Sequence, residues 1–340
     1  MHSILGGKTS ADVTDSDLEL FKSLKELTAL SIAGRGITDA GLFHLRFLDK
    51  LETLSITDAA ITDAGLVHLK GLGRLKTLSL SRTNVTESGL PHLQEMIMLE
   101  SLDLPDMELT DAGGVQLWKL ISQSKLQNIS LPVKSSKSKS RDPALTLRFG
   151  QLNLSNTQIS DAGLRGLDGI PDLTALHLSG TPITDAGLRV VGRLPGLTRL
   201  DLSNSKITGA GLEHLHAIKS LEWLDLSHTD LSDDDLAHLP HVSFELKLSG
   251  TQITDARLSH ENEPARLDLS NTQIGDNGMT TLSTMPRLSE IDLEGTRITD
   301  SGVRLLMKKS HLNWINIRNT QVTFDMLVEL QKVFPHLSVN

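Results

Sequence analysis

The chain has 340 residues, a formal net charge of −9, no cysteine, no tyrosine and three tryptophans. Without cysteine it can have no disulfide, no thiolate metal site and no cysteine nucleophile. An acidic chain of this kind lacks the basic, aromatic-studded face that nucleic-acid binding requires, and a leucine-rich chain with so few aromatic rings suits many small aliphatic layers.

No stretch approaches the roughly 18 consecutive apolar residues of a membrane span, and the amino end has no charged segment followed by an apolar one. These features predict a soluble chain without membrane insertion. They do not fix the compartment, because a signal peptide that had been removed would leave no trace in this sequence. Of the possible compartments we favour the cytoplasm.

The first element in chain order is a half-repeat that begins at Val13, and we assign residues 1–26 to an amino-terminal cap. Regular copies of a 24-residue unit follow, and degenerate copies bring the number of starts to thirteen. The regular copies start at Leu27, Leu51, Leu75, Leu173, Leu197, Leu221, Leu288 and Leu312, and the degenerate ones at Leu99, Leu126, Phe149, Ser243 and Pro264.

Each unit reads L-x-x-L-x-L-x-x-T-x-I-T-D-x-G-L-x-x-L-x-x-L. The first half alternates with period two, so Leu78 and Leu80 share one face of a short strand while Ser79 points the other way. The second half places Ile61 and Leu66 at helical spacing after a Thr-Asp pair that can cap a helix. One copy cannot bury its leucines alone, so stacked copies are expected to share a leucine core.

The sequence resembles the leucine-rich repeat superfamily in its helix-bearing, ribonuclease-inhibitor-like subtype, as in bacterial proteins with "TxITDAGL" repeats. This resemblance implies an α/β solenoid, a curved right-handed superhelix with a parallel β-sheet on the concave face and short helices on the convex face. It also implies protein binding on the concave sheet and no catalytic residues. Threonines stand where the superfamily has asparagine, so hydroxyls are expected to replace an asparagine ladder.

Two regions break the pattern, 132–148 and 257–266. Both keep the strand phase, so we expect one continuous domain over residues 27–340, although a local hinge is an alternative. "LQNISL" and "FGQLNL" are expected to be consecutive strands. "VKSSKSKSRD", residues 133–142, is expected on the outer half of a layer, in place of a helix. Phosphorylation there would reverse its charge, at Ser135, Ser136, Ser138 or Ser140.

Strand phase also lists the side chains of the concave face, and its amino-terminal half carries alanine and small hydroxyl residues. The other half carries the residue types enriched at binding hot spots, tryptophan and arginine, among acidic residues that are also consistent with simple repeat consensus. The expected partner-binding residues are His177, Arg199, Asp201, Trp223, Asp225, Lys247, Arg266, Asp268, Asp292 and Trp314.

The sequence gives little support for a metal site or for an enzyme active site. Histidines recur in "GLxHL" without second ligands at metal spacing, and "SDDDL" at 232–236 reads as helix capping. No phosphate-binding loop or hydrolase signature is present. We therefore expect a non-enzymatic, monomeric scaffold that binds a protein or peptide and needs no cofactor or metal. The alternatives are a substrate-recognition subunit of a ubiquitin ligase or kinase assembly, and a bacterial envelope or surface recognition protein.

Overall fold

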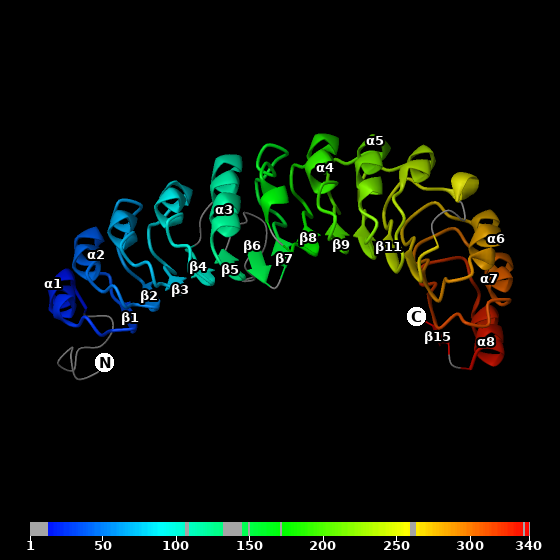
Figure 1. The fold of residues 1–340 in the computed structure, drawn as a ribbon. Helices are drawn as coiled ribbons and strands as arrows, with labels where there is room; N and C mark the ends of the chain where they lie inside the picture. Colours follow the sequence, from blue (N-terminus) through cyan, green and yellow to red (C-terminus); the bar gives the residue numbers. More distant parts are fainter. Residues whose placement is uncertain are drawn as a thin grey trace. The chain divides into compact units, whose positions relative to one another are not determined.

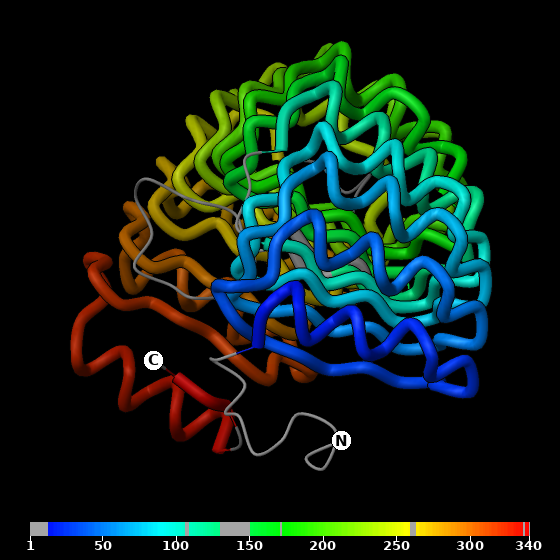
Figure 2. The backbone as a smooth tube through the Cα atoms, turned by 90° about the vertical axis from the view of Figure 1, so that its left-hand side faces the viewer, coloured from blue at the N-terminus to red at the C-terminus, as the bar shows by residue number. Residues whose placement is uncertain are grey.

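The computed structural model describes residues 13–105, 109–131, 145–148, 150–170, 172–258, 263–335 and 337–339. Packing of the Cα trace divides the chain into two compact units, residues 1–173 and 174–340, and each unit is described by itself. In both units the helices lie on one side of the strands (Figure 1). Within each unit the backbone traces of successive repeats follow one another closely (Figure 2).

Unit 1 alternates short strands with short helices. Its β1, β2, β3, β4 and β5 pair in sequence order and run parallel. The strands are β1 (Ala29–Ala33), β2 (Thr53–Thr57), β3 (Thr77–Ser79), β4 (Ser101–Asp103), β5 (Asn128–Leu131), β6 (Leu145–Arg148) and β7 (Gln151–Asn153). The α-helices are α1 (Asp15–Glu19), α2 (Asp39–Leu45) and α3 (Asp111–Gln123), and the 3₁₀ helices are η2 (Leu20–Ser23), η3 (Gly65–Leu69), η4 (Glu87–Leu93) and η5 (Leu167–Gly169).

Unit 2 has the same alternation, and all of its strand pairs are parallel and in register. The strands are β8 (Ala175–His177), β9 (Arg199–Asp201), β10 (Trp223–Asp225), β11 (Glu245–Lys247), β12 (Arg266–Asp268), β13 (Glu290–Asp292), β14 (Trp314–Asn316) and β15 (Ser338–Val339). The helices are α4 (Asp185–Val191), α5 (Gly209–Leu212), η6 (Glu213–Ala217), η7 (Asp233–His238), η8 (Asp255–Arg257), α6 (Asp276–Thr284), α7 (Asp300–Leu306) and α8 (Phe324–Val333).

The leucines of each repeat form its core. In the second regular repeat Leu54, Ile61, Leu66 and Leu69 are all completely buried, although they come from both the strand half and the helix half. Burying a leucine or isoleucine side chain contributes about 1.5–3 kcal/mol each. Because the strand leucines point toward the helices, the alternate side chains of each strand point to the other face of the sheet, and that face is polar.

The Thr-Asp pair of the motif joins neighbouring repeats. Asp276 accepts a hydrogen bond from the amide of Thr299 at 2.8 Å and another from its hydroxyl at 2.6 Å, and Thr299 begins the next helix. Glu87 makes the same two bonds to Thr110, both at 2.7 Å. Equivalent pairs are Asp15–Thr38, Asp39–Thr62, Asp63–Thr86, Asp185–Thr208, Asp233–Thr254 and Asp300–Thr323.

The threonines at the superfamily's asparagine position do not form a ladder between repeats. Each hydroxyl donates to the carbonyl three residues earlier in its own repeat, as Thr251 does to Leu248 at 2.6 Å. The same bond is made by Thr83, Thr157, Thr181, Thr229, Thr272, Thr296 and Thr320. The hydroxyls therefore close each turn, and the acidic residues of the Thr-Asp pairs join the repeats.

The first irregular region differs from the sequence expectation in its strand order. β6 lies between β5 and β7 and runs antiparallel to both, so "LQNISL" and "FGQLNL" are not consecutive strands. On the helix side, Asp111 at the start of α3 accepts bonds from the amide and hydroxyl of Ser160, at 2.6 and 2.5 Å. The helical layers of α3 and of residues 160–169 are therefore direct neighbours, and the expectation for "VKSSKSKSRD" falls on residues outside those that the structure describes. Residues 132–144 lie outside the described residues.

The second irregular region has the shortened helix that the sequence indicates. It consists of η8, a single turn, and residues 259–262 beyond it lie outside the described residues. The strand register continues from β11 to β12. The polar face of unit 2 therefore keeps its alignment where the helix side is reduced.

Candidate functional site

The polar face of unit 2 presents two rows of side chains, because its strands pair in register. The first row is Ala175, Arg199, Trp223, Glu245, Arg266, Glu290 and Trp314. The second row is His177, Asp201, Asp225, Lys247, Asp268, Asp292 and Asn316. The residues between the rows, such as Leu224 and Ile291, are buried against the helices. All ten expected partner-binding residues therefore lie on one face of one sheet.

The second-row aspartates have a local structural role. In each of them Oδ1 accepts the amide of the residue two positions later, which holds the turn that follows the strand. The bonds are Asp201–Ser203 at 3.0 Å, Asp225–Ser227 at 2.9 Å, Asp268–Ser270 at 2.9 Å and Asp292–Glu294 at 3.0 Å. Asn153 and Asn316 make the same bond in their own repeats, so an amide can replace the carboxylate there. A role in the repeat consensus therefore accounts for the hydrogen bond of Oδ1 in each carboxylate, and leaves Oδ2 to be explained.

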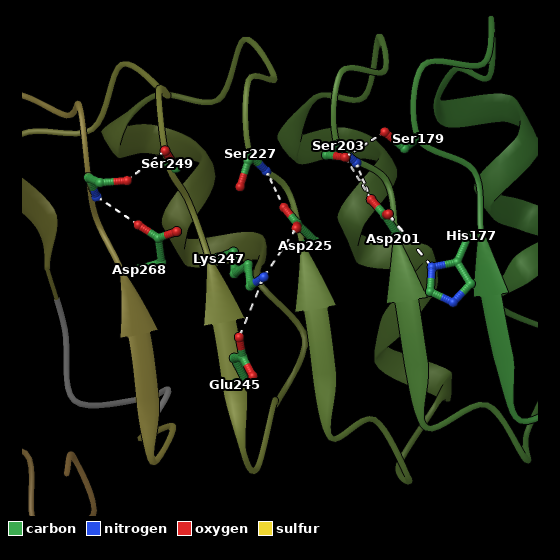
Figure 3. A network of polar contacts seen from close by, with 11 residues as sticks. His177, Ser179, Asp201, Ser203, Asp225, Ser227, Glu245, Lys247, Ser249 and Asp268 are labelled. Atoms are coloured by element: carbon green, nitrogen blue, oxygen red, sulfur yellow. Dashed lines mark hydrogen bonds and ion pairs between the residues drawn. The ribbon is translucent and has the colours of Figure 1, made fainter. Parts of the chain in front are cut away.

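The other oxygen of Asp201 faces His177. The two side chains lie 3.7 Å apart, from Nδ1 to Oδ2, and Figure 3 shows them on neighbouring strands. Burial alone would raise the pKa of Asp201, but the approach of His177 and the hydrogen bonds from Ser203 outweigh it and hold the pKa below its ordinary value. The His177 ring also lies 6.3 Å from that of Trp223, with a tilt of 53° between them. Trp223 is therefore positioned by a neighbour on β8.

Lys247 holds the next part of the network. Its Nζ lies 3.9 Å from Asp225 and 3.6 Å from Glu245 (Figure 3). The same Nζ lies 5.1 Å from the centre of the Trp223 ring. Burial raises the pKa of Asp225, and the charge of Asp201 raises it further, while the bonds from Ser227 and the charge of Lys247 oppose the rise. This first acidic pair, Asp201 and Asp225, thus has one basic side chain beside each member.

The second acidic pair, Asp268 and Asp292, is arranged differently. The two residues are register partners on β12 and β13, and neither forms an ion pair among the described residues. Asp292 accepts a bond from the Asn316 side chain at 3.2 Å. Burial raises the pKa of Asp292, and the charges of Asp268 and Glu294 add to the rise. Lys247 is the register partner of Asp268, but within the described residues neither member of the second pair has a cation within ion-pair distance.

A hollow of about 440 Å³ lies on the polar face over this second pair. We call it the sheet hollow: the charged side chains of β11, β12 and β13 line it, and Trp314, Asn313 and Ser338 line it beside them. Arg266 forms an ion pair with Glu290 at 2.9 Å across its floor and lies 5.0 Å from the Phe244 ring. Both first-row tryptophans are half-buried, so part of each ring faces away from the sheet.

Several residues that line the hollow, and Phe244 beside its lining residue Arg266, were not among the expected partner-binding residues. Phe244 is 44% exposed just before β11, in the degenerate repeat that starts at Ser243. Glu245 and Glu290 stand in the first row, and the strand phase that identifies Trp223 also identifies them. Asn313 lies outside the two-residue periodicity of the strand, so the repeat pattern gives no signal for it.

The remaining sequence candidates lie elsewhere. Ser135, Ser136, Ser138 and Ser140 fall outside the described residues. The recurring histidines occupy helix-side positions; for example, His238 lies 3.0 Å from Glu213, and the His68 ring meets that of Phe43 edge-on. Within the described residues no group of three or more His, Cys, Asp or Glu side chains could hold a metal ion. Within the same part of the chain, every helix is too short or too polar to cross a membrane.

Comparisons with known proteins agree with this geometry. A family model described as leucine-rich repeat matches residues 170–192, 195–215 and 266–283. An internalin structure from Listeria monocytogenes is 22% identical with a TM-score of 0.56, and the match covers 92% of each chain. A leucine-rich repeat protein structure from Leptospira interrogans is 15% identical with a TM-score of 0.53, covering 94% of this chain and 91% of that one.

A search of the curated proteins finds no match. The structural matches, at such low identity, bear on the fold alone. Together with the family model and the repeated strand-helix geometry, they show that the chain contains leucine-rich repeats and has the α/β solenoid fold.

Proposed function

We propose that this protein is a non-enzymatic scaffold that binds a protein or peptide on the polar face of unit 2. Leucine-rich repeat proteins generally act in protein–protein interaction, and this chain offers a surface suited to it. The observation that carries the proposal is the pair of half-exposed tryptophans, Trp223 and Trp314, which stand in one row with the sheet hollow between β11 and β14. Aromatic anchors of this kind, surrounded by polar side chains, are typical of interaction hot spots.

The corresponding face of unit 1 offers much less. Its first-row residues are small or uncharged, such as Thr53 and Thr77, and Ser79 donates to Asp103 at 2.9 Å. Small hydroxyl side chains provide little contact area and no cationic or aromatic anchor. We therefore place the partner on unit 2 and assign unit 1 a structural role.

The repeat subtype supports the same proposal. We infer the helix-bearing, ribonuclease-inhibitor-like subtype, because helices of seven to nine residues recur after the strands, as in α4, α6 and α7. We further propose that the protein acts as a monomer, without nucleic acid or membrane insertion, and favour the cytoplasm. Membership of a ubiquitin ligase or kinase assembly, or a role in envelope recognition, would use the same face and remains the second candidate.

Alanine replacement of both tryptophans tests the proposal. Peptides or proteins selected on the intact chain should lose binding to Trp223→Ala/Trp314→Ala, because the rings provide most of the apolar contact area. The matched control is Thr53→Ala/Thr77→Ala, which changes the same strand position in unit 1 and should bind normally. Melting temperatures should be close for both variants and the unaltered chain. If the tryptophan variant binds as well as the control, the site assignment is wrong.

A further inference from the structure

The polar face of unit 2 has more negative than positive charge, and the excess is local. Its two rows contain six carboxylates, with Arg199, Lys247 and Arg266 as the permanently charged cations. His177 lies beside Asp201, Lys247 lies beside Asp225, and Arg266 forms an ion pair with Glu290. The sheet hollow is therefore net negative, with Glu245, Asp268, Glu290 and Asp292 against Lys247 and Arg266, and within the described residues Asp268 and Asp292 are the carboxylates there without an ion pair.

Like charges directly opposite each other on neighbouring strands destabilise the sheet. Asp268 and Asp292 bear this cost in the described chain, although asparagine at the same position holds the same turn elsewhere, in Asn153 and Asn316. Nothing in the turn itself therefore requires two carboxylates here. A cation supplied from outside would balance them, and Trp314 at the same hollow provides an aromatic surface that also favours a cationic side chain.

We propose that the sheet hollow receives a lysine or arginine side chain from the partner, between Asp268, Asp292 and Trp314. The inference rests on the proposed function, because it names the chemistry of the peptide that the two tryptophans anchor. The occupant is an extended segment that crosses the strands, with an apolar residue at each tryptophan and the basic residue between them.

Strand spacing sets the length of that segment. Trp223 and Trp314 stand four strands apart, which is about 19 Å at about 4.8 Å per strand, and Asp268 stands midway on β12. A polyproline II segment rises about 3.1 Å per residue and repeats its face every three residues. Side chains about three and six residues after the first anchor would therefore face Asp268 and Trp314 in turn.

The experiment begins with selection of short random peptides on the intact chain, followed by affinity measurement by fluorescence anisotropy. We expect selected peptides to carry a basic residue about three positions from each of two apolar residues. Replacing that basic residue by glutamine should weaken binding roughly tenfold or more, the effect expected for a charged hydrogen bond. Binding should also weaken as salt is added.

Two matched variants separate charge from structure. Asp268→Asn keeps the Oδ1 acceptor for the amide of Ser270 and should lower the affinity for basic peptides about tenfold. Asp103→Asn makes the same change at the corresponding strand position of unit 1, outside the proposed site, and should change affinity by no more than about threefold. Asp268→Lys places at β12 the residue that β11 holds as Lys247, and should reverse the preference toward peptides with a central glutamate.

The outcomes distinguish this inference from the proposed function. If selected peptides bind through the tryptophans but show no basic preference and do not respond to Asp268→Asn, the inference is wrong and the proposed site stands. If selected peptides do not respond to Trp223→Ala/Trp314→Ala, the proposed site itself is wrong. A central acidic preference in the unaltered chain would also overturn the inference.

Discussion

Replacing Asp276 with alanine would remove one link between two repeats of unit 2. Asp276 begins α6 and accepts the amide and hydroxyl of Thr299 at 2.8 and 2.6 Å, in a partly buried position. Hydrogen bonds to a charged group contribute about 1.5–3 kcal/mol each, and the low end applies to a partly exposed pair. A carboxylate at a helix start adds about 0.3–1 kcal/mol. The expected loss is therefore about 3 kcal/mol.

That loss should appear as a change in coupling between repeats, because the two bonds join α6 to α7 and leave the leucine core untouched. For a unit of this size, about 3 kcal/mol corresponds to a fall in melting temperature of roughly 6–12 °C. Urea unfolding followed by circular dichroism measures the free energy directly. Hydrogen exchange should show faster opening of α7 than of repeats farther away.

The matched control is Asp276→Glu. Glu87 occupies the equivalent position in unit 1 and makes both bonds at 2.7 Å, so a longer carboxylate fits the same geometry. The glutamate variant should lose less than about 1 kcal/mol, the scale of one ordinary hydrogen bond. Equal losses in the alanine and glutamate variants, or a loss below about 0.5 kcal/mol in the alanine variant, would refute the assigned role of the carboxylate.

Three further substitutions test other parts of the structure. Gly278→Ala should lower the free energy of unfolding by about 1–3 kcal/mol in chemical denaturation, because the new Cβ would lie 2.5 Å from the carboxylate of Asp255 in the preceding repeat. The control Gly73→Ala places its Cβ in open space and should leave stability unchanged. Asp268→Asn should stabilise the protein by about 0.2–1 kcal/mol at neutral pH, because it relieves Asp292, whose pKa is raised by burial and by neighbouring charge. This gain should shrink in melting curves as the pH falls through the raised pKa of Asp292, because that carboxyl group is then neutral. Hydrogen bonds from the next repeat's threonine amide and hydroxyl lower the pKa of Asp300, so Asp300→Asn should be less stable at neutral pH, and this difference should shrink as pH falls through the lowered value.

The repeat architecture could be predicted from the sequence because period and strand phase are local patterns. Leucine spacing identifies the buried side of each strand, and the same phase places Trp223 and Arg266 on the polar face. The expected Thr-Asp cap has a second function that spacing within one repeat does not show. Its carboxylate bonds the repeat that follows, 23 residues away in the case of Asp276. Contacts between copies become visible only when the copies are stacked.

The irregular region was harder to predict for a related reason. Strand phase is preserved on both sides of residues 132–148, and it carries no information about strand direction. β6 enters antiparallel as part of a hairpin with β7, and Gly150 lies in the turn between the two strands with a φ of 77°. The hairpin adds strands without adding a helix, and Asp111 reaches Ser160 directly. A count of residues between repeats cannot distinguish this arrangement from a layer that has lost its helix.

The second-row aspartates connect stability with recognition. In each of them Oδ1 accepts a hydrogen bond within the turn after its strand, so Oδ2 is the oxygen that can contact a partner. The contribution of Oδ2 to binding depends on the side chains beside it. His177 lies beside Asp201 and Lys247 beside Asp225, whereas within the described residues Asp268 and Asp292 have no basic side chain within ion-pair distance. The same substitution, Asp268→Asn, should therefore raise stability and lower affinity for a basic peptide. Opposite effects on these two measurements would mean that Asp268 destabilises the free chain and stabilises the complex. A residue with only a structural consensus role would not show these opposite effects.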